Sequence, residues 1–128
     1  MIKENELRIG SILNYLTAEG DICLATIDCQ DLKWLNEDPK GFNMVHSVIE
    51  LTPEWLIKFG FEEKERDHSI IYFIGINFVT NDYLFDITWI EGYSYPFYRN
   101  GYFEIKYVHQ LQNLYFALTG EELEVNQH

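Results

Sequence analysis

The clearest pattern of hydrophobic and polar positions lies near the end of the chain, over residues 107–120. Four apolar residues recur there at the spacing of one helical face: Val108, Leu111, Tyr115 and Leu118. This spacing is typical of an amphipathic helix. Gly120 follows, and glycine suits the left-handed conformation that ends many helices. The pattern predicts a helix that buries this face and ends at Gly120.

The opposite face of the same helix is polar, carries no charge and ends in an aromatic residue. Its members are His109, Gln112, Asn113 and Phe116. Amide and imidazole groups can hydrogen-bond a neighbouring strand or orient a polar ligand. We expect the structural role first, and we keep the four residues as a candidate interaction surface.

The first half of the chain alternates apolar and polar residues in short runs. This alternation predicts a hairpin of two strands over residues 7–16 and 21–28, and a third strand over residues 45–51. A short helix fits residues 31–36, and residues 36–41 have the composition of a loop. Three short strands in this order indicate a small SH3-like β-barrel.

A second helix is indicated by clear start and stop signals. Thr52 can cap its first turn, and Pro53 suits the first helical position. Gly60 can supply a left-handed end, where Phe61 can fold back on Leu56. Further strands are predicted over residues 61–64, 69–76 and 83–90, with a charged turn at residues 65–68.

The last predicted hairpin turns at Asn100 and Gly101, the residue pair that most strongly indicates a two-residue turn. The pairs that follow are Tyr98 with Phe103 and Pro96 with Ile105. The other face of the hairpin then carries a second candidate interaction surface: Tyr95, Phe97, Arg99 and Tyr102. Tyr and Arg are enriched at the centres of protein interfaces. The alternative is that the last helix or the N-terminal barrel covers this face.

These elements predict an α+β fold, with an N-terminal SH3-like β-barrel half and a C-terminal antiparallel sheet packed by the C-terminal helix. A chain of 128 residues is long enough for one core. It has no internal repeat and no low-complexity segment. We therefore expect one compact domain over residues 1–128, with possible halves at residues 1–51 and 52–128.

Charge changes the expected partners. Nine Lys and Arg against 21 Asp and Glu give a net charge of −12, which opposes attraction to nucleic-acid phosphates and anionic lipid. We expect no direct nucleic-acid or membrane partner. Plain solubility explains the charge, and the alternative is an acidic surface that attracts a basic partner or imitates DNA. The chain has no apolar leader or spanning segment, so we expect a cytoplasmic protein.

Motifs for small-molecule chemistry are absent from the sequence. The four histidines lack the spacing of metal ligands, and the two cysteines have no second pair to complete a zinc site. Nucleophile and phosphate-loop motifs are missing too. Asp86, amid apolar residues, is a candidate general acid, although strand alternation favours a solvent-facing carboxylate. We expect no catalytic residue, no cofactor and no metal.

Three blocks of sequence resemble a known group of proteins. They are N-E-L-R-I-G at residues 5–10, L-T-P-E-W-L-I-K-F-G-F at residues 51–61 and V-H-Q-L-Q-N-L-Y-F-A-L-T-G-E-E-L at residues 108–123. The chain resembles a family of short uncharacterised proteins found in gut bacteria and their phages or mobile elements. That family has no assigned activity, so the resemblance implies a setting and no mechanism.

The sequence thus favours a non-enzymatic binding or accessory protein that acts through a protein partner or through self-association. The resemblance implies that a phage or mobile element encodes it. Two alternatives stay open: an acidic DNA mimic that inhibits a nucleic-acid-binding protein, and a small-molecule enzyme. Salt dependence separates the first from an aromatic interface, since screening weakens only the charged contact.

Overall fold

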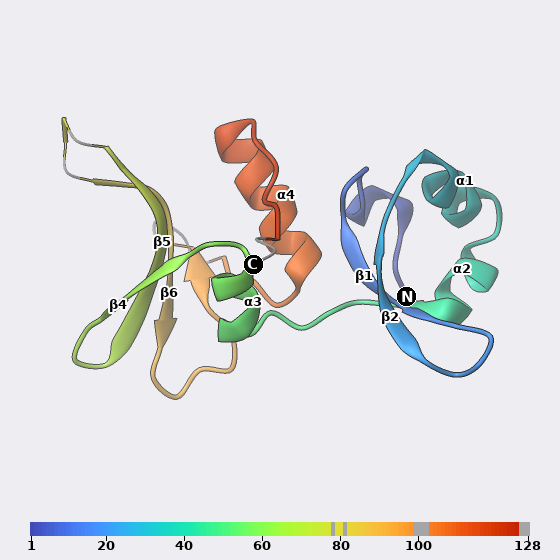
Figure 1. Cartoon of the computed structure of the whole chain (residues 1–128), viewed down its shortest axis with the longest axis horizontal. Helices are drawn as coiled ribbons and strands as arrows, with labels where there is room; N and C mark the ends of the chain where they lie inside the picture. The colour runs from blue at the N-terminus through green and yellow to red at the C-terminus, as the bar shows by residue number, and fades with distance from the viewer. Residues whose placement is uncertain (78, 81, 99–102, 126–128) are drawn as a thin grey trace. The chain divides into compact units, whose positions relative to one another are not determined.

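The computed structural model describes residues 1–77, 79–80, 82–98 and 103–125 (Figure 1). It combines helices with two antiparallel sheets, which confirms the α+β class. The chain divides into two compact units. The first unit is Met1–Glu50 with Tyr107–Glu122, and the second is formed by the described residues of Leu51–Lys106 and Leu123–His128. The C-terminal helix therefore belongs with the N-terminal residues, whereas its predicted place was on the C-terminal sheet.

The first unit holds a three-stranded sheet in the order β2-β1-β3. Its elements are η1 (Glu4–Glu6), β1 (Ile12–Leu16), β2 (Ile22–Thr26), α1 (Cys29–Glu37), α2 (Pro39–Val45), β3 (His46–Ser47) and α4 (Val108–Thr119). Helices α1 and α2 lie beside the sheet (Figure 1). Leu13 from β1, Leu35 from α1 and Phe42 from α2 meet in its core.

Residues 36–41 are not the predicted loop. Asp38 ends α1 and at the same time caps α2, because its carboxylate accepts a hydrogen bond from the Gly41 N–H at 3.2 Å. Pro39 occupies the start of α2, where its missing N–H costs nothing. Loop-like composition here encodes a junction between two helices.

The SH3-like barrel is also corrected. The three-stranded sheet stays open, and β3 has only two residues, so the described residues form no closed barrel. The predicted strand over residues 45–51 is short because α2 occupies its start. Only an isolated bridge between Glu50 and Tyr107 continues the pairing.

The second unit holds a four-stranded antiparallel sheet in the order β4-β5-β6-β7. Its elements are α3 (Pro53–Lys58), β4 (Glu62–Glu65), β5 (Ser69–Asn77), β6 (Asp82–Ile90) and β7 (Phe97–Tyr98). Thr52 Oγ1 accepts from the Trp55 N–H at 3.4 Å, and Phe61 N–H donates to the Leu56 carbonyl at 3.0 Å. With Gly60 at φ +91°, both predicted ends of this helix are confirmed.

The register predicted for the last hairpin is confirmed on the residues that the structure describes. Phe97 bridges Glu104, and the Tyr98 N–H donates to the Phe103 carbonyl at 2.9 Å. The Ile105 N–H donates to the Pro96 carbonyl, also at 2.9 Å. The predicted turn at residues 100–101 lies outside the described residues.

Helix α4 ends as predicted, with Gly120 at φ +76° and its N–H bonded to the Phe116 carbonyl at 2.8 Å. Its apolar face is buried at three of the four predicted positions, whereas Leu118 is 52% exposed. In the described part of the chain, no helix combines the length and apolar character needed to cross a bilayer.

Candidate functional site

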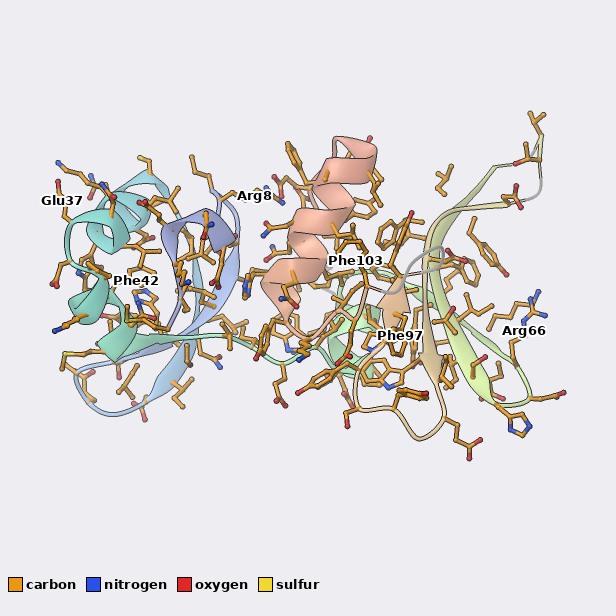
Figure 2. All side chains as sticks on the ribbon, turned by 180° about the vertical axis from the view of Figure 1, so that it is seen from behind. Arg8, Glu37, Phe42, Arg66, Phe97 and Phe103 are labelled. Carbon is orange, nitrogen blue, oxygen red and sulfur yellow. The ribbon has the colours of Figure 1, made fainter. Side chains whose placement is uncertain are left out.

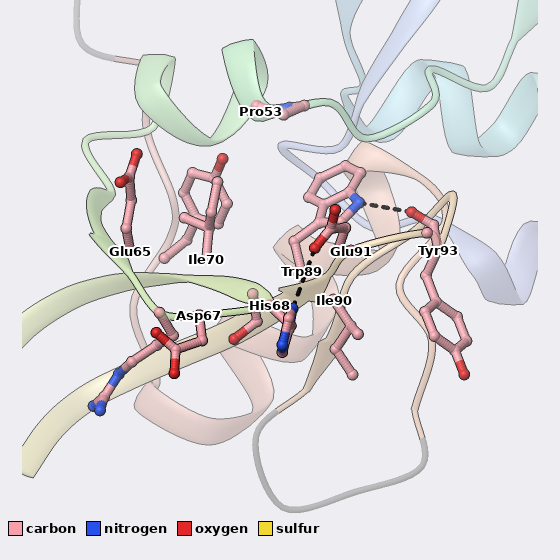
Figure 3. Close-up of a pocket in the computed structure, with 13 residues that line it drawn as sticks. Pro53, Glu65, Asp67, His68, Ile70, Trp89, Ile90, Glu91 and Tyr93 are labelled. Atoms are coloured by element: carbon pink, nitrogen blue, oxygen red, sulfur yellow. Dashed lines mark hydrogen bonds and ion pairs between the residues drawn. The ribbon is translucent and has the colours of Figure 1, made fainter.

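A pocket of about 390 Å³ opens in the second unit, where two turns meet (Figure 3). One turn follows β4 and the other follows β6. The Glu91 N–H donates to the His68 carbonyl at 2.8 Å, which ties the two turns together. Gly92 at φ +89° supplies a conformation that other residues rarely adopt. Pro53, at the start of α3, also lines the pocket.

The pocket has an apolar and aromatic floor. Strand pairing sets Ile70 opposite Trp89, and Tyr72 lies two residues further along the same face of the sheet. The rings of Tyr72 and Trp89 meet edge to face at 6.4 Å. The Trp89 indole N–H donates to the Tyr93 carbonyl at 3.0 Å (Figure 3). Because that donor is used internally, Trp89 offers the pocket its ring surface.

The rim of the pocket is mainly acidic. Its carboxylates come from Glu65, Asp67 and Glu91. Glu65 pairs with Ile70, so both side chains lie on the same side of the sheet, whereas Glu62 points to the other side. The charged turn predicted at residues 65–68 is exposed. The same turn also lines a cavity, which the sequence pattern did not predict.

Two basic residues complete the rim. His68 Nδ1 lies 3.5 Å from a Glu91 carboxylate oxygen, and both side chains are largely exposed. Arg66 extends outward from the ribbon (Figure 2). Below them, burial raises the pKa of Tyr72 to about 12, with help from the charge of Glu63 and its hydrogen bond. Tyr72 is therefore a neutral phenol at physiological pH.

Most of the polar face of α4 is engaged in contacts within the first unit, whereas Phe116, at its end, is 41% exposed. Gln112 is 1% exposed. Its Oε1 accepts from the Ile12 N–H at 2.9 Å, and its Nε2 donates to the Gly10 carbonyl at 2.9 Å. The side-chain amide thus closes the edge of β1 beyond the point where β3 stops. The structural role that we expected first is confirmed for Gln112.

Asn113 and His109 also face the N-terminal segment. Asn113 Nδ2 donates to the Glu6 carbonyl at 2.8 Å. His109 is 2% exposed, and its Nε2 lies 4.0 Å from a Glu6 carboxylate oxygen. Burial lowers the pKa of His109, and the charge of Glu6 partly opposes that shift. The Tyr107 ring stacks on the imidazole at 5.8 Å.

Arg8 completes this contact. Its guanidinium donates to the Gln112 carbonyl at 3.0 Å and pairs with the Glu122 carboxylate through both terminal nitrogens. The same group lies 4.4 Å from the centre of the Phe116 ring. Figure 2 shows Arg8 reaching toward α4. We call the contact the amide seam: Glu6, Arg8, Gly10 and Ile12 with His109, Gln112, Asn113, Phe116 and Glu122. It joins two of the sequence blocks that carry the resemblance.

The aromatic hairpin surface is described only in part. Arg99 and Tyr102 lie outside the described residues. Tyr95 and Phe97 are half-buried; Lys106 Nζ lies 5.9 Å from the centre of the Tyr95 ring, and the rings of Tyr93 and Phe97 meet edge to face at 5.4 Å. These contacts come from the same unit.

A free strand edge was missed by the sequence analysis. β2 is an edge strand of its sheet. Main-chain groups of Asp21 and Ile27 bond the β1 side, so by the alternation of an antiparallel pair those of Cys23 and Ala25 also face β1. The N–H and C=O groups of Ile22, Leu24 and Thr26 therefore point away from β1, on the side of β2 where the sheet has no further strand among the described residues. Ile22 is 70% exposed and Leu24 is 54% exposed. The signal was an uncharged strand without proline.

The remaining chemistry is limited in what the structure describes. Asp86 is 6% exposed, which corrects the expectation that it faces solvent: both faces of β6 are covered at Phe85–Ile87. Among the described residues, no three His, Cys, Asp or Glu side chains gather as metal ligands would. Compared with known proteins, the chain matches no family model, no curated protein and no solved structure.

Proposed function

We propose that this protein is a non-enzymatic binding protein that takes an extended segment of a protein partner on the free edge of β2. The observation that carries the proposal is the row of outward N–H and C=O groups on Ile22, Leu24 and Thr26. An unpaired edge is a template for a further strand. Adding a partner's strand to such an edge is a recurring mode of peptide recognition.

The edge strands β2 and β4, one from each sheet, differ in how they are protected. β4 has the sequence Glu-Glu-Lys-Glu, and charges on an edge strand discourage pairing with other chains. β2 has the sequence Ile-Cys-Leu-Ala-Thr and carries no such protection. Leu16, which pairs with Ile22 and is 42% exposed, extends the apolar surface beside this edge. The contrast favours β2 as a surface kept open for binding.

Charge decides which kind of segment fits. Glu19 and Asp21 precede β2 and Asp28 follows it, and all three are exposed. A segment with an apolar centre and basic ends would match this edge. A second copy of the chain would bring the same acidic ends and another net charge of −12, which opposes approach. We therefore favour a different protein over self-association. The resemblance to phage and mobile-element proteins is compatible with such an accessory role.

The experiment uses proline as a backbone probe. The Leu24 N–H points outward, so Leu24→Pro keeps the β1–β2 hydrogen bonds and blocks an added strand. Leu24→Thr is the matched control, because it removes the apolar side chain and keeps the N–H. Wild-type and variant proteins serve as baits in a native lysate, and hydrogen exchange follows the β2 amides of the complex. We expect the wild-type protein to capture a partner chain that protects the Ile22, Leu24 and Thr26 amides from exchange. Leu24→Pro should abolish this capture, and Leu24→Thr should retain it.

Other results would contradict the proposal. Equal capture by Leu24→Pro and wild type would place the partner elsewhere. A homodimer that Leu24→Pro abolishes would replace the partner with a second copy. Capture of a nucleic-acid-binding protein that survives Leu24→Pro and disappears steeply with salt would favour the DNA-mimic alternative.

A further inference from the structure

We propose that the pocket of the second unit is a second binding site, which takes an organic cation with an apolar stem, an alkylammonium or guanidinium group. The proposal rests on residues of β4, β5 and β6 and is independent of the β2 edge. The volume of the pocket, about 390 Å³, falls in the range of small-ligand pockets. No aspect of catalysis is involved.

The floor of the pocket suits the stem and the charge of such a ligand. Trp89 is the best aromatic partner for a cation, and its indole N–H is already bonded to the Tyr93 carbonyl. Tyr72 stays neutral, because its pKa lies at about 12, and so adds no negative charge or free base. Ile70 adds apolar surface beside both rings.

The rim suits the head group. Glu65, Asp67 and Glu91 offer carboxylate oxygens that can only accept hydrogen bonds when ionised. An ammonium or guanidinium group supplies only donors, so the two sides are complementary. An anionic ligand would face this rim with like charge, with Arg66 and His68 as the basic groups of the lining. His68 Nδ1 lies 3.5 Å from a Glu91 carboxylate oxygen, so the ligand would share Glu91 with His68 and find its main acceptors in Glu65 and Asp67.

Two sources could supply the cation: a Lys or Arg side chain of a partner protein, or a free small amine. The free-cation probes are therefore the methyl esters of Nα-acetyl-lysine and Nα-acetyl-arginine, whose side chains keep their charge. The peptide probes are capped Gly-Gly-Lys-Gly-Gly and Gly-Gly-Arg-Gly-Gly. N-acetyl-norleucine methyl ester has the lysine stem without its charge and is the control. The Trp89 indole signal in a ¹H–¹⁵N spectrum of the whole chain reports binding.

We expect saturable shifts of the Trp89 signal with the cations and none with the norleucine ester. Glu65→Gln should weaken binding about fivefold, the effect of losing one partly exposed ion pair. Glu62→Gln makes the same charge change on the other side of β4 and should stay within about twofold. Tighter binding of the peptides assigns the site to a partner's side chain; equal binding assigns it to a free amine.

A second variant tests the aromatic floor. Trp89→Leu should weaken cation binding about tenfold by removing the ring, with isothermal calorimetry in place of the lost indole signal. If Trp89→Leu melts well below the wild type, Glu91→Gln takes its place, with the same expected direction. The proposal is overturned if no cation binds, if norleucine ester binds equally well, or if Glu62→Gln and Glu65→Gln weaken binding to the same extent.

Discussion

The amide seam of the first unit and the pocket of the second are both built from polar side chains next to aromatic rings, yet their hydrogen-bonding groups are used differently. In the seam, both ends of the Gln112 amide bond main-chain groups of the N-terminal segment. In the pocket, Glu65 and Asp67 stand exposed at the rim of a cavity. Polar groups that are bonded internally hold the fold, whereas groups left open to solvent can bind a ligand.

The physical reason is the cost of burial. A buried donor or acceptor without a partner costs about 1–3 kcal/mol, while an exposed group is satisfied by water. The buried bonds of Gln112 therefore stabilise the first unit, although Arg8 Nε, His109 Nδ1 and Asn113 Oδ1 are buried in the seam without a hydrogen-bond partner among the described residues. The pocket can release water for a ligand at little cost.

Gln112→Leu should lower the free energy of unfolding by about 2–5 kcal/mol, because it leaves the Ile12 N–H and the Gly10 carbonyl unpaired at a buried position. Urea titration measures the loss. Gln30→Leu on α1 is the control, because Gln30 is exposed and the change in side chain is the same. Equal effects of the two substitutions would show that the Gln112 bonds contribute nothing.

Arg8→Met should destabilise the protein by about 1–3 kcal/mol, the range of a charge-assisted hydrogen bond together with a stacked cation. The Gln112 carbonyl, Glu122 and Phe116 all lose their contact with the guanidinium. Arg66→Met, at an exposed position, is the matched control. A double-mutant cycle with Glu122→Gln should give a coupling of about 1 kcal/mol. A coupling near zero would remove the ion pair from the seam.

Local signals predicted the ends of elements well. The Thr52 cap, the Gly60 stop and the Gly120 stop each depend on residues within one or two turns of the chain. The register of the last hairpin followed from a two-residue turn signal for the same reason. The helix junction at Asp38 was not predicted. One residue there ends a helix and caps the next, and a junction of this kind has the same residue composition as a loop.

Long-range contacts could not be predicted from one sequence. The seam joins Gly10 to Gln112, which are 102 positions apart, and periodicity identifies a face without naming what covers it. The pocket was missed because its lining comes from separate turns. The sequence carried one signal of the pocket. Because alternate residues of a strand lie on the same face, Glu65 lies on the sheet face that Tyr72 and Trp89 share.

The pH dependence of stability should carry a contribution from His109. Burial lowers its pKa in the folded state below the ordinary value of 6.5, with Glu6 the charged group facing it. As the pH falls below 6.5, the unfolded chain takes up the proton first, so the folded state loses stability until the pH reaches the lower folded pKa. Above that window this contribution is constant.

Thermal melts between pH 8 and pH 5, at constant ionic strength, measure this contribution. His109→Gln should flatten the loss of stability toward low pH relative to the wild type. His68→Gln is the control for removing an exposed imidazole in the second unit. A wild-type curve that His109→Gln does not alter would show that the buried imidazole is protonated without cost.

The smallest effect on stability is expected in the pocket. Glu65→Gln and Glu62→Gln should each change the free energy of unfolding by less than about 0.5 kcal/mol, since both side chains are exposed. Any shift should be toward greater stability, because β4 carries Glu62, Glu63 and Glu65 close together and like charges repel. Urea titration of both variants, in parallel with Gln112→Leu, gives the comparison directly.

A loss above about 1 kcal/mol for Glu65→Gln, beyond what an exposed position allows, would make Glu65 a structural residue like Gln112. The contrast between seam and pocket would then fail, because the rim carboxylate would already be engaged within the fold.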